Sequence, residues 1–129
     1  MIVCDTSALV AILQGEPEAE SLRSVLSVSG DLSLAAASYL EGAMVAHRQA
    51  FARANLDVLV KSFAMTFIPL DEAVARRAAD AFARYGRGTG HPAALNFGDC
   101  ISYATAKHLD CPLLFKGDDF RHTDVKVAL

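Results

Sequence analysis

The sequence predicts an α/β fold in which helices cover both faces of a mainly parallel sheet of four or five strands. Two observations lead to this prediction. Short apolar runs alternate along the 129 residues with longer segments of helical periodicity, and 53% of all residues are hydrophobic. Apolar strands separated by helices are typical of parallel sheets that are buried on both faces. We therefore expect one domain over residues 1–129 with a sizeable core.

The predicted strands share a short length and an apolar composition. In chain order they are residues 1–4, 32–36, 65–70, 112–115 and 124–128. Because helical segments separate the first four, these strands are expected to run parallel, with their carboxyl ends at one edge of the sheet. Ligands of open α/β sheets bind outside that edge.

The predicted helices are placed by capping residues and by hydrophobic side chains that recur every three or four positions. Asp5 offers an N-cap for the first helix, and Pro17 opens the second. Ser38 and Glu41 form a capping-box pattern that predicts a third helix ending near Phe51. The helices are expected over residues 8–13, from Pro17 onward, 38–51, 55–63, 71–85, and from Asn96 or Asp99 to Leu109.

Composition excludes several classes of protein. No stretch is long and apolar enough to span a bilayer, and the N-terminus lacks the basic region of a secretory signal. Three cysteines without a CxxC pair favour a reducing cytoplasm over a disulfide framework. A net charge of −3 argues against a protein that passively coats nucleic acid. It does not exclude an enzyme whose acidic residues gather at one metal site.

Four carboxylates follow or adjoin the predicted strand ends. Asp5 follows the first strand, Glu41 lies one turn into the helix after the second, Asp99 begins a helix, and Asp118 follows the fourth strand. Two such charges 4 Å apart repel by about 4 kcal/mol at an effective dielectric near 20, so a cluster needs protons or a cation. Oxygen ligands favour Mg²⁺ or Mn²⁺. Each acid alone is equally explained as a cap, a turn residue or a solvated side chain.

Four segments together resemble the PIN-domain ribonucleases of the VapC type, which are toxins of bacterial toxin–antitoxin pairs. They are residues 1–9 (MIVCDTSAL), 37–41 (ASYLE), 95–104 (LNFGDCISYA) and 112–120 (PLLFKGDDF). The resemblance spans the whole chain and implies a three-layer α/β/α sandwich. It also implies a Mg²⁺- or Mn²⁺-dependent endoribonuclease that hydrolyses RNA phosphodiester bonds.

The resemblance also assigns roles to individual residues. Asp5 and Asp99 would be the principal metal ligands, and Glu41 would complete the site directly or through water. The fourth acid falls at Asp118 or Asp119, of which Asp118 is preferred because it is nearer the strand end. Many family members have a Thr two residues before this Asp, whereas this chain has Phe-Lys-Gly at residues 115–117.

The resemblance implies three partners: the RNA substrate, a small antitoxin that blocks the site, and a second copy of this chain. DNA would be reached only through the antitoxin, and no membrane is involved. The helix face of Leu22, Val25 and Leu26 is a candidate partner surface, although we prefer to assign it to the core.

Further side chains have both a functional and a structural interpretation. The hydroxyls of Thr6 and Ser7 and the amide of Asn96 could serve the site or only cap and turn. Base stacking is open to Tyr39 and Phe97, but core packing is preferred for both. Five basic residues could hold RNA phosphates or be ordinary surface: Arg84, Arg87, His91, Lys116 and Arg121.

The main alternative is a binding module without catalysis, either a silent PIN-like domain or a receiver-like domain. Lys116 after a late strand has some receiver character, but the predicted strands offer no phosphoacceptor Asp in the right order. Tyr103 and Lys107 fit the YxxxK pattern of short-chain dehydrogenases. No GxGxxG follows the first strand, however, which argues against a dinucleotide site.

Overall fold

The computed structural model describes residues 1–48 and 51–129 of the chain. Over these residues it contains four strands, β1 (Ile2–Cys4), β2 (Leu32–Ala35), β3 (Thr66–Ile68) and β4 (Leu113–Leu114). The helices are α1 (Thr6–Leu13), α2 (Ala19–Val28), α3 (Ala36–Arg48), α4 (Arg53–Ser62), α5 (Glu72–Tyr85) and α6 (Phe97–His108). A short 3-10 helix, η1 (Asp119–His122), follows β4.

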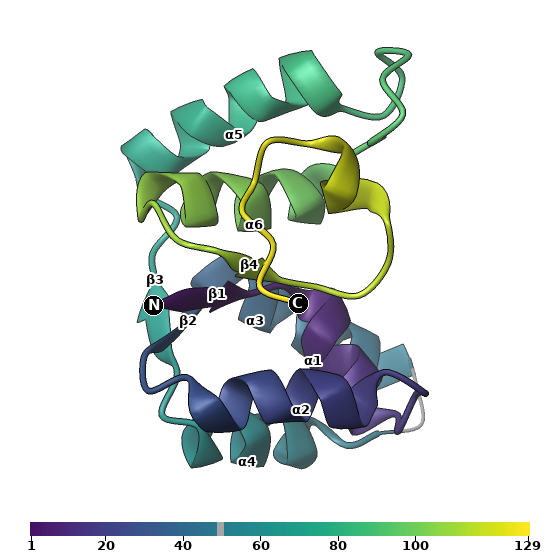
Figure 1. The fold of residues 1–129 in the computed structure, drawn as a ribbon, viewed down its shortest axis with the longest axis vertical. Helices are drawn as coiled ribbons and strands as arrows, with labels where there is room; N and C mark the ends of the chain where they lie inside the picture. The colour runs from purple at the N-terminus through teal and green to yellow at the C-terminus, as the bar shows by residue number, and fades with distance from the viewer. Residues whose placement is uncertain (49–50) are drawn as a thin grey trace.

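The strands form one parallel sheet in the order β3-β2-β1-β4. Val3 of β1 pairs with Ser33 of β2 on one side and with Leu113 of β4 on the other. All carboxyl ends therefore meet at one edge, where β1 leads into α1 (Figure 1). The predicted parallel α/β fold is confirmed, with the central strands β1 and β2 both followed by helices that reach this edge.

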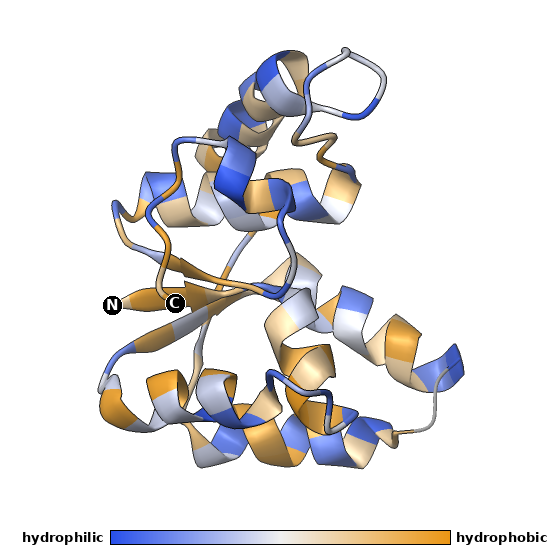
Figure 2. Cartoon of the chain, turned by 45° about the vertical axis from the view of Figure 1, so that its right-hand side comes forward, coloured by the Kyte–Doolittle hydropathy of each residue, from blue (hydrophilic) through white to orange (hydrophobic). Residues whose placement is uncertain are grey.

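Helices cover both faces of the sheet (Figure 1). On one face α1, α2 and α4 pack with Cys4 in one core cluster, and on the other α5 and α6 pack with Val3 in a second cluster. The strands are almost wholly hydrophobic whereas the helices alternate (Figure 2), as expected for a sheet that is buried on both faces. Leu22 and Leu26 of α2 are buried at 1% exposure, which confirms their assignment to the core.

The predicted fifth strand over residues 124–128 is wrong. Val127 makes only an isolated parallel bridge with Leu113. Because β4 is two residues long, it offers a single position for such pairing. The C-terminal segment is held instead by side chains of α6, as described below.

The capping box predicted at Ser38 is also wrong. Helix α3 begins at Ala36, so Ser38 lies inside it and is 2% exposed. Its hydroxyl lies 3.2 Å from the Ser102 hydroxyl of α6, and its carbonyl accepts a hydrogen bond from Thr6 Oγ1 at 3.0 Å. The Ser38 side chain thus joins α3 to α6 across the core. The described part of α3 ends at Arg48, and the expected extension through residues 49–50 lies outside the described residues.

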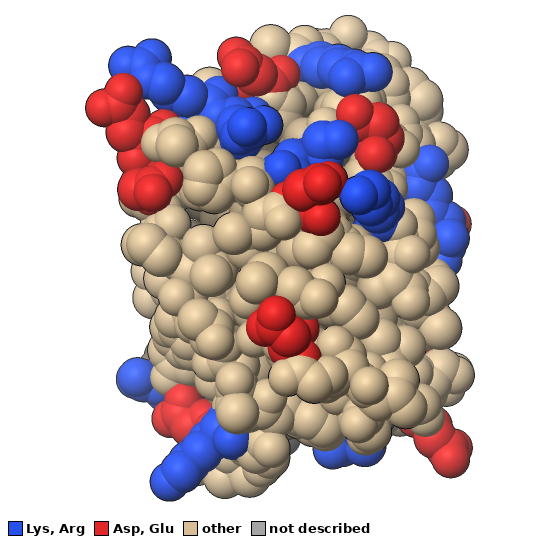
Figure 3. Space-filling view, turned by 60° about the vertical axis from the view of Figure 1, so that its left-hand side comes forward, with Lys and Arg blue, Asp and Glu red and all other residues tan. Residues whose placement is uncertain are grey.

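Charged side chains gather over α5, α6 and the C-terminal segment, with both signs interspersed (Figure 3). Several are paired there, including Arg76 with Glu72 at 2.8 Å and Lys126 with Asp110 at 2.9 Å. Below them this face carries few charges (Figure 3). Over the part of the chain that the structure describes, every helix is too short or too polar to cross a membrane.

Candidate active site

Asp5 leaves β1 directly at the carboxyl edge of the sheet. Its backbone N–H donates to Leu114 O of β4 at 2.8 Å, which fixes its position between the two strands. Its carboxylate caps α1 by accepting the Ser7 N–H at 3.0 Å. The residue is only 4% exposed. A buried carboxylate with one helix-cap bond retains acceptor capacity for a second partner.

Asp99 lies in the first turn of α6 and is both a capping residue and a site residue. Asn96 is the N-cap, so the helix begins at the first of the two predicted positions. The Asn96 side chain accepts the Asp99 N–H at 2.9 Å, and Asp99 Oδ2 accepts the Asn96 N–H at 3.1 Å. This capping box holds the Asp99 carboxyl in place. Asn96 therefore has the capping role, one of the two left open.

Burial raises the pKa of Asp99 from its ordinary 3.8 to about 6, and this rise is partly offset by the hydrogen bond from the Asn96 backbone. The charges of Asp5, Asp119 and Glu41 raise it further. Burial likewise raises the pKa of Glu41, opposed by a hydrogen bond with Thr6 and reinforced by the charge of Asp5. These acids therefore repel one another in the fold, which is the signature of a site that gathers like charges.

Glu41 reaches α6 through a gap that only glycine leaves open. A Cβ built on Gly98 would lie 2.5 Å from Glu41 Oε2 and 2.8 Å from Oε1. The carboxylate of α3 therefore rests against the backbone of the first turn of α6, beside Asp99. Sequence reasoning missed this role, although a glycine inside the first turn of a predicted helix is a signal of close approach.

Asp5, Glu41 and Asp99 line one cavity of about 230 Å³ together with Thr6, Ser7, Val10 and Val45. The structure thus brings together three of the four predicted acids from β1, α3 and α6. Among the described residues no three His, Cys, Asp or Glu side chains lie close enough to form a ready coordination shell. An oxygen-only donor set in an open cavity fits a hard divalent cation that keeps waters as further ligands.

The loop after β4 contributes the remaining acids. Gly117 has a φ of +100°, a left-handed conformation that turns the chain sharply toward η1. Asp118 precedes η1 and Asp119 is its first residue. Asp119 is among the charges that raise the pKa of Asp99, and Asp118 is not. The electrostatic coupling therefore favours Asp119, whereas strand proximity favoured Asp118.

Most of the predicted phosphate-holding cations are engaged within the chain. Lys116 Nζ pairs with Glu16 at 2.7 Å and Glu18 at 3.5 Å, and its backbone N–H donates to Ser7 Oγ at 3.0 Å. The Ser7 hydroxyl therefore ties α1 to the loop after β4. Arg121 donates to the Leu129 carbonyl at 2.9 Å and lies over the Phe115 ring.

Two more of these residues lie near Tyr85, at the end of α5. Arg84 lies over the Tyr85 ring and 3.9 Å from Asp124, and the His91 ring meets the Tyr85 ring edge-on. The backbone N–H of Arg87 donates to Leu95 O at 2.9 Å. None of these three lines the carboxylate cavity.

Comparison with known proteins places this chain. The family model for the PIN domain matches residues 2–126. The chain is 46% identical to "Ribonuclease VapC28" of Mycobacterium tuberculosis over 130 residues, covering 99% of this chain and 98% of that protein. It is 44% identical to "Ribonuclease VapC" of Mycolicibacterium smegmatis over 127 residues, covering 96% and 97%.

The chain belongs to the VapC-type PIN-domain ribonucleases. The resemblance stated from the four sequence segments is confirmed.

Solved structures of other proteins have the same PIN fold. VapC20 of Mycobacterium tuberculosis matches with a TM-score of 0.78 at 13% identity, covering 100% of this chain and 98% of that one. FitAcB of Neisseria gonorrhoeae matches with a TM-score of 0.71 at 23% identity, covering 98% and 96%. The three-layer α/β/α architecture predicted from the family resemblance is thereby confirmed.

Two aromatic residues of this PIN domain were expected in the core. Tyr39 meets this expectation in part, because its half-buried ring packs 5.2 Å from the Phe67 ring and its hydroxyl donates to Asp57. Phe97 does not, because its side chain is 79% exposed. It follows Asn96 at the first position of α6, where the helix start projects beyond the sheet edge.

The YxxxK pattern has a structural explanation. The Tyr103 hydroxyl donates to Asp124 Oδ1 at 2.5 Å, and Lys107 Nζ lies 3.3 Å from Asp124 Oδ2. Both residues sit on one face of α6, one turn apart. They anchor the C-terminal segment to the helix and lie away from the carboxylate cavity.

Proposed function

We propose that this chain is a divalent-metal-dependent endoribonuclease, the toxin of a VapBC-type pair, whose site consists of Asp5, Glu41, Asp99 and Asp119. The observation that carries the proposal is the single cavity onto which β1, α3 and α6 each place a carboxylate. The mutual repulsion that raises the pKa of Asp99 to about 6 supports it, because a cation would relieve that repulsion.

Each residue has a separate task in this proposal. Asp5 and Asp99 hold a Mg²⁺ or Mn²⁺ ion through carboxylates that helix caps keep in position. Glu41, packed against Gly98, closes the third side of the cavity. When bound, such a cation activates water for attack on a phosphodiester and neutralises charge on the phosphate. Asp99 is mostly ionised above pH 6, so the site is charged and ready for a cation at neutral pH.

Metal-dependent cleavage is tested on purified total RNA with the chain alone. We expect discrete products with Mg²⁺ or Mn²⁺ and none with EDTA. Asp5→Asn should lower the rate about 100-fold or more while the protein stays folded. Asp31→Asn is the matched control, because Asp31 is an exposed acid that precedes β2 at the opposite edge of the sheet. Chelator-resistant cleavage, or full activity in Asp5→Asn, would overturn the proposal.

The assignment of the fourth acid needs its own comparison. Asp119→Asn should slow cleavage by at least about 10-fold, because its charge acts on Asp99. Asp118→Asn, one residue away, should have a smaller effect if it only precedes η1. The reverse order of the two effects would assign the site to Asp118.

A small antitoxin is proposed to cover the carboxylate cavity. Structural neighbours support it: one is titled a toxin–antitoxin complex from Klebsiella pneumoniae, and another is FitAB bound to a DNA fragment. In this proposal DNA is bound only through the antitoxin. Co-purification with the product of an adjacent short reading frame, with loss of RNA cleavage, is the expected result. A folded chain that binds this partner and metal but cleaves no RNA would favour the silent binding module instead.

We further propose that the active protein contains two copies of this chain. The exposed apolar side chains of α3 and α6 beside the cavity support this proposal. The geometry of the contact is taken up in the next subsection.

A further inference from the structure

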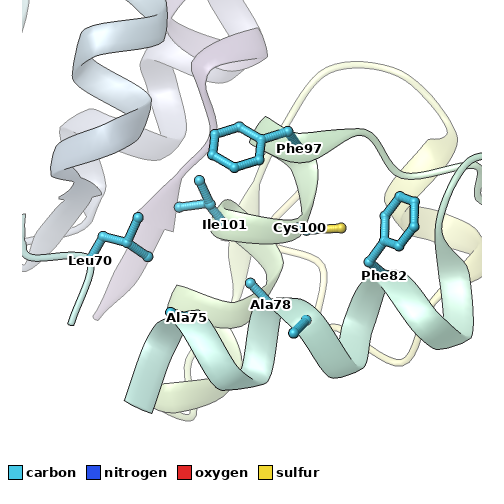
Figure 4. A pocket seen from close by; sticks show the side chains of 8 residues that line it. Leu70, Ala75, Ala78, Phe82, Phe97, Cys100 and Ile101 are labelled. Atoms are coloured by element: carbon cyan, nitrogen blue, oxygen red, sulfur yellow. The ribbon is translucent and has the colours of Figure 1, made fainter. Parts of the chain in front are cut away.

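Two adjoining apolar grooves lie beside the carboxylate cavity. The first, of about 450 Å³, separates α5 from α6, and Figure 4 shows Phe97 and Ile101 of α6 on the same groove as Leu70 and Phe82. The second, of about 280 Å³, lies between α3 and α6 and is lined by Leu40 and Met44 together with the same two α6 residues. We call the two grooves together the α3–α6–α5 face.

Large apolar side chains on this face are exposed to solvent. Phe97 is 79% exposed, Leu40 60% and Met44 53%, while Ile101 forms the buried floor between them. Contiguous apolar surface of this kind marks a contact with another molecule. Leu, Met and Ala dominate the lining, whereas a surface that holds RNA needs cations along the backbone path. A protein partner therefore fits the α3–α6–α5 face better than RNA does.

The charges of the face favour self-association. Among the described residues that line the two grooves, Glu41 and Arg48 are the charged ones. They are seven residues apart on α3, which places them about 10 Å apart along the same side of the helix. In a two-fold contact, residue i of one copy meets residue j of the other and the reverse. An antiparallel crossing of α3 on itself near Met44 would thus place each Arg48 opposite a Glu41.

We propose that a second copy of this chain docks on the α3–α6–α5 face and delivers its Arg48 to the rim of the carboxylate cavity. Glu41 lines both the second groove and that cavity, so a cation that meets it also borders the site. Lys116, the basic residue nearest the site in sequence, is engaged by Glu16 and Glu18. The docking stands on its own, and the role of Arg48 at the site rests on the proposed ribonuclease function.

Association is tested without RNA, metal or antitoxin, by sedimentation and light scattering. The wild type should be a dimer, and Met44→Asp should weaken dimerisation at least about 30-fold, because the change occurs twice in a two-fold contact. Phe97→Asp provides a second variant at another exposed position of the face. Val58→Asp on α4 is the matched control, since Val58 is 62% exposed and outside the face. A monomeric wild type, or a dimer indifferent to Met44→Asp, would overturn the docking.

The pairing of Arg48 with Glu41 is tested by reversing charges. Arg48→Glu should weaken the dimer about 10-fold or more by placing like charges together, and the double variant Glu41→Arg/Arg48→Glu should restore it. Because association is the readout, loss of catalysis at Glu41 does not affect the result. Failure of the double variant to restore dimerisation would reject this register of the two helices.

Delivery of Arg48 to the site predicts complementation. Chains carrying Glu41→Gln or Arg48→Ala should each be impaired, and a mixture should recover about a quarter of wild-type activity through the mixed dimers, each with one complete site. An Arg48→Ala chain with full activity as a dimer would refute the role at the site but leave the docking intact. Wild-type chain that dimerises yet cleaves no RNA would instead refute the ribonuclease function. Monomers that use Met44 only to bind an antitoxin would show that a different protein occupies the face.

Discussion

At the scale of single residues, the carboxylate cavity is an arrangement that costs stability. Asp99 is buried among the charges of Asp5, Asp119 and Glu41, and its pKa rises to about 6. A carboxyl whose pKa is higher in the folded than in the unfolded chain binds more protons when folded. The free energy of unfolding therefore falls as the pH rises from about 4 through 6, and the full cost remains above that window.

Asp99→Asn should consequently stabilise the metal-free protein. In EDTA above pH 6 we expect its free energy of unfolding to exceed that of the wild type by roughly 1–2 kcal/mol, after allowance for partial solvent screening. The Asn amide oxygen can still accept the Asn96 N–H, so the helix cap is kept. The difference should disappear below about pH 4, where the wild-type carboxyl is protonated in both states. Urea unfolding between pH 3.5 and 8 measures this, and a variant less stable than wild type at pH 7.5 would contradict it.

Gly98 has an equally local role, because its missing side chain makes room for Glu41. In Gly98→Ala the new Cβ would lie 2.5 Å from Glu41 Oε2, and the flexible end of Glu41 can move away. We expect the fold to be kept, with a change in the free energy of unfolding within about 1 kcal/mol, and RNA cleavage to fall at least about 10-fold. Gly30→Ala is the control, because nothing lies within 4 Å of its Cβ position. Unchanged cleavage in Gly98→Ala would mean that Glu41 acts from another position.

At the scale of elements, α6 joins the site to the C-terminal segment. Its first turn carries Asp99, and its later turns hold Asp124 through Tyr103 and Lys107. The hydrogen bond from Tyr103, and then the contact with Lys107, lower the pKa of Asp124 against the effect of burial. A carboxyl with a lowered folded pKa stabilises the fold above its unfolded pKa, and that stabilisation is lost as the pH falls through the folded value.

Asp124→Asn should therefore destabilise the chain by roughly 1 kcal/mol at pH 7, a modest value because the Asp124 side chain is 44% exposed. The difference from wild type should shrink below about pH 4. Asp110→Asn is the control, since the Asp110 side chain is 88% exposed and its bridge to Lys126 is expected to contribute less than about 0.5 kcal/mol. Thermal unfolding across pH 3 to 8 compares the two, and a pH-independent effect at Asp124 would reject the electrostatic explanation.

At the scale of the whole molecule, the distribution of charge separates stabilising from functional electrostatics. The charges over α5 and α6 are largely paired (Figure 3), whereas those of the carboxylate cavity are of one sign. A ligand that binds only the folded chain raises its stability by RT ln(1 + [L]/Kd), or about 2.7 kcal/mol at 100 times Kd. A cation in the cavity would therefore stabilise the entire fold.

Mn²⁺ or Mg²⁺ should raise the melting temperature of the wild type, and excess EDTA should reverse the shift. The shift should be lost in Asp5→Asn and kept in Asp31→Asn, which has the same change in net charge. Differential scanning calorimetry at matched ionic strength measures it. Equal shifts in the two variants would indicate general screening of the acidic chain and would argue against a specific site.

Local features of the sequence determined the order of the elements, the parallel sheet, and the caps at Asp5, Asp71 and Asn96. A cap or an apolar run depends on neighbours within a few residues, so its pattern is legible without the fold. The convergence of Asp5, Glu41 and Asp99 was also predictable, because parallel strands bring their carboxyl ends to one edge.

Only the tertiary structure decided the features that depend on residues distant in sequence. Packing against Ser102 turned Ser38 from an expected cap into a buried contact inside α3, and Asp124 gave Tyr103 and Lys107 an anchoring role. The exposure of Phe97 and the fit of Glu41 over Gly98 likewise depend on how α3, α5 and α6 pack. Such outcomes follow from long-range packing, which overrides local preference because burial and charge involve whole surfaces and not single segments.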